Sequence, residues 1–111
     1  DMVIYAAEPE GAADACESLR RGERITGIEP DTICAGLRVT LGPINFALLT
    51  GYAVAVLPIA DRDTIAAMRL IWQSLTLWVE PSSAIALAAI LCHRLSLVNP
   101  FQGRHDFITS L

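Results

Sequence analysis

The sequence predicts an α/β fold in which a mostly parallel sheet is covered by helices on both faces. Two observations support this class. Short, continuous apolar runs, typical of strands buried on both faces, alternate along the chain with segments that favour helix. No internal repeat or low-complexity linker interrupts this alternation, so we expect the 111 residues to belong to one domain.

The chain is expected to begin with a strand-loop-helix unit. Residues 2–7 form an apolar run that ends at Glu8-Pro9, after which Gly11 turns the chain. Residues 12–21 favour a helix that is acidic at its start and basic at its end, as the helix dipole prefers. Gly22 is the expected stop of this helix.

A second helix and a second strand are expected in the middle of the chain. A turn and helix start at residues 29–32 is followed by a glycine-punctuated loop. Pro43 fits the first turn of a helix that runs to about Gly51. Residues 53–59 form another continuous apolar run, which predicts a buried strand.

The third expected helix covers residues 62–79, with Asp61 as its N-cap. Apolar residues recur in it at helical spacing, which predicts one buried face. We interpret Trp72 and Trp78 as core or interface residues. The buried face is expected to contain Ile65, Met68, Ile71 or Trp72, Leu75 and Val79.

The end of the chain is expected to contain one more helix and the start of one more strand. Glu80-Pro81 breaks the third helix, and Ser82 or Ser83 can cap a nearly uncharged helix that continues over residues 84–95. A helix this apolar must be buried. Residues 106–111 favour a strand, and because the chain stops inside it we expect a fragment of a larger protein.

The composition argues against several classes of function. The net charge is -4 and the eight basic residues are scattered, so nucleic acid is not an expected ligand. All eight are arginine, so the chain has no lysine and cannot form a Schiff base on its own. The 53% hydrophobic content suggests a surface for a partner, and we expect the parent protein to be a homodimer.

The cysteines and the uncharged middle segment bear on the cellular location. Cys16, Cys34 and Cys92 are widely spaced and form no CxxC pair, which favours reduced thiols and a cytoplasmic protein. Residues 39–60 carry no charge and are long enough to span a bilayer, but glycines and prolines interrupt them. We therefore expect no membrane association, with a membrane peptide as the alternative.

Two groups of polar residues are candidates for chemistry. Glu8 ends a strand and Asp14 starts a helix six residues later, so the two carboxylates and a backbone carbonyl between them could share Mg²⁺ or Ca²⁺. The simpler alternative is that Asp14 only complements the helix dipole. The second group, Glu80 with two hydroxyls at a helix start, could be a site or an ordinary Pro-Ser helix break.

The two histidines are not expected to be functional. Among the acidic and thiol side chains, only Cys92 lies near His93 in the sequence, and it is not at a metal-ligand spacing. We interpret His93 as a helix residue and His105 as a surface residue.

Four segments carry a family resemblance. They are residues 6–12 (AAEPEGA), 31–37 (DTICAGL), 66–72 (AAMRLIW) and 79–84 (VEPSSA). In this order and spacing they resemble the pyridoxal-phosphate-dependent serine/threonine dehydratase and serine racemase family. The resemblance implies the type II pyridoxal-phosphate fold, with residues 1–111 as part of its mostly parallel, helix-covered large domain.

The resemblance also implies the roles of individual residues. A divalent cation, Mg²⁺ or Ca²⁺, is expected on the carboxylates of Glu8 and Asp14 and the carbonyl of Ala12, which favours the cation interpretation of this loop. The pocket for pyridoxal phosphate is expected to be lined by Glu80, Ser82 and Ser83, with Ser110 as the partner of the pyridine nitrogen.

The implied parent protein is an ammonia-lyase or racemase that acts on L-serine or L-threonine. The family's cofactor-binding lysine and glycine-rich phosphate loop are absent from these 111 residues, so we expect the chain alone to be inactive. The alternative is a catalytically inactive remnant that serves as a cation-stabilised binding or dimerising module.

Overall fold

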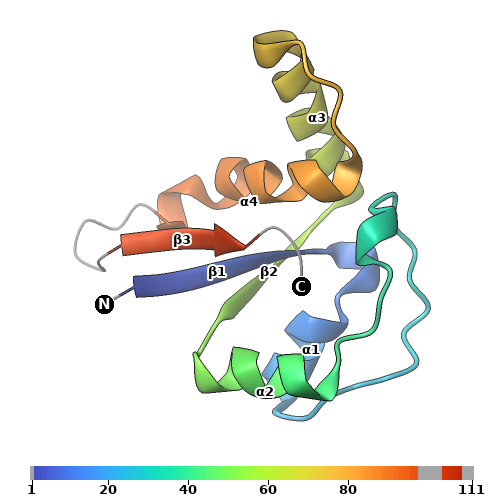
Figure 1. Cartoon of the computed structure of the whole chain (residues 1–111), viewed down its shortest axis with the longest axis vertical. Helices are drawn as coiled ribbons and strands as arrows, with labels where there is room; N and C mark the ends of the chain where they lie inside the picture. Colours follow the sequence, from blue (N-terminus) through green and yellow to red (C-terminus); the bar gives the residue numbers. More distant parts are fainter. Residues whose placement is uncertain (1, 98–103, 109–111) are drawn as a thin grey trace.

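The computed structural model describes residues 2–97 and 104–108 (Figure 1). Strands and helices alternate in the predicted order. The elements are β1 (Met2–Pro9), the 3₁₀ turn η1 (Glu10–Ala12), α1 (Asp14–Arg21), the 3₁₀ turn η2 (Ala35–Leu37), α2 (Pro43–Gly51), β2 (Ala55–Ile59), α3 (Asp61–Leu75), α4 (Pro81–Leu97) and β3 (Arg104–Ile108).

The described strands form a parallel sheet in the order β2-β1-β3. The central strand β1 pairs with β2 from Tyr5 opposite Ala55 to Pro9 opposite Ile59. Parallel neighbours need a crossover connection, so each helical segment between them is carried onto a face of the sheet. In Figure 1, α1 and α2 cover one face and α4 covers the other. The predicted α/β class with a parallel, helix-covered sheet is confirmed.

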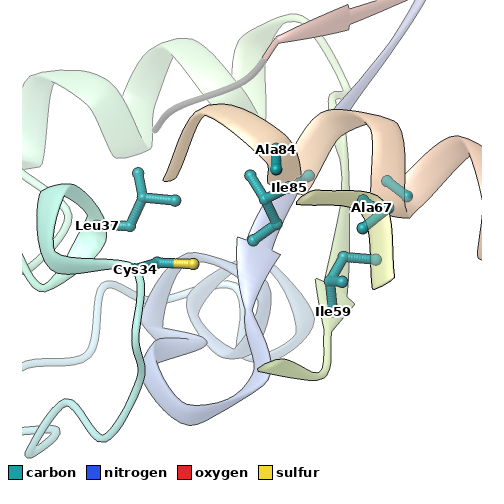
Figure 2. Packing of buried hydrophobic residues seen from close by; sticks show 9 residues of the cluster. Cys34, Leu37, Ile59, Ala67, Ala84 and Ile85 are labelled. Carbon is teal, nitrogen blue, oxygen red and sulfur yellow. The ribbon is translucent and has the colours of Figure 1, made fainter. Parts of the chain in front are cut away.

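Adjacent residues of β1 contribute to two different hydrophobic clusters, because successive side chains of a strand point to opposite faces. Ala6 is fully buried among Ala15 of α1, Leu49 of α2 and neighbouring apolar residues. Ala7 is fully buried in a second cluster against α3 and α4. Figure 2 shows this second cluster, with Ile85 of α4 between Leu37 and Ile59.

The helix ends follow the local sequence signals in three places. Gly22 adopts a left-handed conformation with φ of 75° and its N–H bonds to the Ser18 carbonyl, which ends α1. Pro43 is the first residue of α2. The expected acidic start and basic end of α1 are present, and its last turn carries Arg20 and Arg21, which both pair with Glu17.

The prediction for α3 was wrong in its length and in its buried face. The helix ends at Leu75, because Thr76 turns into the left-handed region with φ of 55°. Thr64 and Ala67 are the buried positions of this helix, and Ala67 belongs to the cluster that α4 contributes to. Ile65 and Leu75, which were expected inside, are 44% and 63% exposed.

The uncharged segment 39–60 forms α2 and β2 with their connections, as the buried strand and helix interpretation predicted. Across the two stretches that the structure describes, none of the helices combines the length and the apolar character that a membrane crossing requires.

Candidate functional site

The predicted site residues lie where the parallel strands end. Glu8 is near the carboxyl end of β1, and Asp61 follows the carboxyl end of β2. Figure 1 shows η1, η2 and the starts of α3 and α4 gathered at this same end of the sheet. Ligands of open α/β sheets bind outside the carboxyl ends of the strands. This edge is therefore the candidate site.

Glu8 is buried, with 6% of its surface exposed, and it caps α1 from the neighbouring strand. Its Oε1 accepts the N–H of Ala15 at 3.0 Å and its Oε2 accepts the N–H of Cys16 at 2.9 Å. The residue at the N-cap position is Ala13, which has no side-chain acceptor for these groups. A side chain distant in sequence thus replaces the usual cap.

Burial raises the pKa of Glu8 to about 7. The two N–H groups oppose this rise because they stabilise the charged form, whereas the nearby carboxylate of Asp14 adds to it. The pair is an acidic centre that is only partly compensated by the protein.

Asp14 is equally buried and connects α1 to the segment before α2. Its Oδ2 accepts the N–H of Leu41 at 2.6 Å. On the other side of the loop, the carbonyl of Gly11 accepts the N–H of Asp31 at 2.9 Å. A Cβ atom on Gly11 would lie 1.8 Å from the Asp31 carbonyl oxygen, so this close approach requires glycine. Both bonds hold the loop rigidly at the end of β1.

A small cavity of about 10 Å³ lies beside this loop, roughly the room that one water molecule needs. Ala12 and Asp14 line it, whereas Glu8 is not among its lining residues. Glu8 instead lies beside Asp14. In the described part of the chain, no three acidic, histidine or cysteine side chains form a metal-binding group. The structure thus brings the three predicted cation ligands close together, with two of them facing a cavity.

The second predicted group lies at the start of α4. Glu80 and Ser83 are exposed, and Ser83 is in the first turn of the helix, where its N–H bonds to the Glu80 carbonyl at 3.0 Å. Ser82 is half-buried, and its Oγ accepts the N–H of Gly36 at 3.1 Å. Ser110, the predicted partner of the pyridine nitrogen, lies outside the described residues.

The role predicted for Asp61 was wrong. It is the first residue of α3 and its side chain makes no capping bond to that helix. Its carboxylate accepts the hydroxyl of Thr32 at 2.6 Å and the N–H of Ile33 at 3.0 Å. Sequence reasoning missed this contact. The available signal was the position of Asp61 directly after a buried strand, at the edge where the loops of an α/β sheet meet.

An apolar cleft of about 510 Å³ lies between α3 and the segment before α4. Trp72 and Trp78 form one wall, with stacked rings whose centroids are 4.3 Å apart. Trp78 is 82% exposed, so the tryptophans are not core residues in the described structure. Arg69 is the one charged residue among those that line the cleft in the described part of the chain.

The cysteines are all free, as predicted, and Cys34 is buried in the core. Burial raises the pKa of the Cys34 thiol, which favours the protonated form. His93 is half-buried in α4. His105 belongs to β3, but its side chain is outside the described part of the structure.

Residues 1–103 match the family model of pyridoxal-phosphate dependent enzymes. The chain belongs to this family. It is 39% identical over 93 residues to a serine racemase of Dictyostelium discoideum, a match that covers 82% of this chain and 29% of the relative. It is also 38% identical over 88 residues to the β-hydroxyaspartate dehydratase of Paracoccus denitrificans, covering 79% of this chain and 28% of the relative.

Solved structures show the same fold. The maize serine racemase matches with a TM-score of 0.82 and 26% identity over 99% of this chain and 42% of that chain. A threonine deaminase from the organism abbreviated T.th. matches with a TM-score of 0.83 and 29% identity over 97% of this chain and 39% of that chain. The predicted family and the predicted fold are confirmed. The chain spans less than a third of the length of the two curated relatives.

We predict that Gly11→Ala destabilises the protein by about 3 kcal/mol, the upper part of the usual range for overpacking, because the new methyl group collides with backbone. Urea unfolding followed by circular dichroism measures this change. Gly51→Ala is the control, since a Cβ atom there meets nothing within 4 Å. A Gly11→Ala midpoint equal to that of the unchanged protein would show that the loop does not approach Asp31 as closely as described.

Proposed function

We propose that the complete protein uses pyridoxal phosphate to labilise the α-proton of L-serine or L-threonine. The outcome is β-elimination to a keto acid and ammonia, or racemisation. The observation that carries this proposal is the match of residues 1–103 to the family of pyridoxal-phosphate dependent enzymes. The relatives named serine racemase and the solved threonine deaminase support the substrate class.

The described residues fit one side of such a cofactor. Glu80 and Ser83 are exposed side chains at the start of a long helix, at the carboxyl edge of the sheet. The first N–H groups of a helix and its dipole favour an anionic or polar ligand at this end. The adjacent cleft is lined mainly by apolar side chains and does not fit the phosphate group. The cofactor surface is therefore the exposed start of α4.

Pyridoxal phosphate supplies an electron sink for the charge that develops when the α-proton leaves. In this proposal the chain orients the cofactor: Ser83 provides a hydroxyl and Glu80 a carboxylate, while Ser110 contacts the pyridine nitrogen. The lysine that bonds the cofactor must come from the rest of the complete protein, since these 111 residues contain none. Residues 1–111 are then part of the large domain of a cytoplasmic enzyme.

We further propose that Mg²⁺ or Ca²⁺ binds to the carbonyl of Ala12 and the carboxylates of Asp14 and Glu8. The cavity beside Ala12 and Asp14 and the partly compensated acidic pair support this site. Each carboxylate oxygen of Glu8 retains a lone pair after it accepts one N–H, so capping of α1 does not exclude coordination. Both cations prefer such oxygen ligands and would retain water in their other positions.

The second candidate function is a cation-stabilised dimerising module, and the exposed Trp72–Trp78 stack favours it. Ile65, Met68 and Trp72 repeat at helical spacing beside the face of α3 that packs on α4. A helix with a second apolar face is typically covered on that side too. A second copy of the chain offers the same apolar face, as a two-fold interface requires. This surface is also the proposed dimer interface of the complete enzyme.

Cofactor binding is tested by adding pyridoxal phosphate to the full-length protein. We expect an absorbance band near the visible edge from the lysine-bound cofactor, and no such band from residues 1–111. Ser83→Ala should weaken cofactor binding about fivefold to tenfold, the usual effect of one lost hydrogen bond. A full-length protein that binds no pyridoxal phosphate would overturn the proposed function.

Cation binding is tested by thermal unfolding with increasing Mg²⁺ or Ca²⁺. The melting temperature of the unchanged protein should rise with concentration, because a ligand that binds only the folded state stabilises it. Asp14→Asn should lose this response while it still accepts the N–H of Leu41. Glu23→Ala, at an exposed position, should retain it. An unchanged response in Asp14→Asn would exclude Asp14 as a ligand.

Dimerisation is tested by sedimentation equilibrium. The unchanged chain should associate as its concentration rises, and Trp78→Ser should weaken this association at least about tenfold, as expected for a central aromatic contact. Tyr52→Ser is the matched control, because Tyr52 is also highly exposed but lies at the end of α2. A strictly monomeric chain, or equal losses in both variants, would contradict this interface.

A further inference from the structure

The segment from Thr32 to Leu37 is held between the starts of two helices. One end is bonded to Asp61, the first residue of α3, and the other end is bonded to Ser82, in the first turn of α4. These helix starts lie at the carboxyl edge of the sheet, where open α/β sheets bind their ligands. The segment is thus part of the candidate site, although its sequence contains few polar side chains.

The bond to Asp61 uses both oxygens of one carboxylate. Oδ1 accepts the hydroxyl of Thr32 at 2.6 Å and Oδ2 accepts the N–H of Ile33 at 3.0 Å. The same Thr32 hydroxyl oxygen accepts the N–H of Cys34 at 3.2 Å. Hydrogen bonds to an ionised group are stronger than those between neutral groups. This end of the segment is therefore firmly attached to α3.

The bond to Ser82 depends on close contact with Gly36. The Gly36 N–H donates to Ser82 Oγ at 3.1 Å, and a Cβ atom on Gly36 would lie 3.1 Å from the same oxygen. Serine at a helix start commonly accepts an N–H of its own helix. Here the hydroxyl oxygen accepts an N–H from a segment 46 residues earlier in the chain.

Core packing completes the attachment. Cys34 and Leu37 are buried in the same cluster as Ile85, as Figure 2 shows. Ala35 and Gly36, between them, remain exposed. The result is a short exposed backbone surface that is fixed from below by packing and from both ends by side-chain hydrogen bonds.

We propose that Ser82 is a positioning residue and not a direct ligand of the cofactor. Its hydroxyl, together with the Asp61 carboxylate, fixes residues 33–36 as one wall of the cofactor site, while Ser83 and Glu80 face the cofactor. The assignment of this wall to pyridoxal phosphate rests on the proposed function, whereas the Ser82 contact itself does not.

The contact is tested by amide hydrogen exchange in the 111-residue chain. Ser82→Ala should speed exchange of the Gly36 amide about fivefold or more, because its acceptor is removed. Ser82→Thr retains a hydroxyl and should preserve most of the protection, and Ser83→Ala should leave it unchanged. Equal exchange at Gly36 in the unchanged chain and in Ser82→Ala would overturn the contact, whatever the cofactor does.

The positioning role is tested in the full-length protein by the dissociation constant of pyridoxal phosphate. Ser82→Ala should weaken binding and Ser82→Thr should restore it, in parallel with the Gly36 exchange rates. Ser83→Ala should weaken binding without any change at Gly36. Weaker binding in Ser82→Thr with Gly36 still protected would make Ser82 a direct ligand and overturn the proposal.

Two further outcomes are distinct. Faster exchange at Gly36 with unchanged cofactor affinity in Ser82→Ala would overturn the positioning role. Absence of cofactor binding in the unchanged full-length protein would overturn the proposed function and the cofactor part of this inference, and the exchange data would then judge the Ser82 contact alone.

Discussion

The contact on which most of this structure depends joins the Glu8 carboxylate to the first N–H groups of α1. Because β1 is the central strand, this contact places α1 relative to the whole sheet. The neighbouring bonds extend the arrangement, since Asp14 holds the segment before α2 and Gly11 holds the segment that begins at Asp31. The end of one strand thus positions two separate loops.

This arrangement buries two acidic side chains beside each other. Burial of a carboxylate is unfavourable unless hydrogen bonds or opposite charges compensate it. The backbone N–H groups supply part of the compensation, yet the pKa of Glu8 stays well above its usual range. The same two features, an unbalanced acidic pair and a small adjoining cavity, connect the structural role of this loop to its proposed cation.

The carboxyl edge of the sheet collects residues from distant parts of the chain into one rigid surface. Asp61 and Ser82 each belong to a helix start, but both use their side-chain oxygens to hold the same segment. A cofactor site benefits from such prior organisation, because less order must be imposed when the ligand binds. The apolar cleft with its two tryptophans lies beside this edge and has a different chemistry, which suits another protein surface.

Sequence by itself determined the strands, the helix order and the parallel sheet, because continuous apolar runs and glycine or proline signals act locally. It also indicated the end of β1 and the start of α4 as functional positions. Only the tertiary structure decided that α3 stops at Leu75, that Asp61 serves a loop and not its own helix, and that Ser82 bonds to Gly36. These features depend on partners distant in the sequence, and a hydroxyl or carboxylate has no preference between a local N–H and a remote one until packing brings them together.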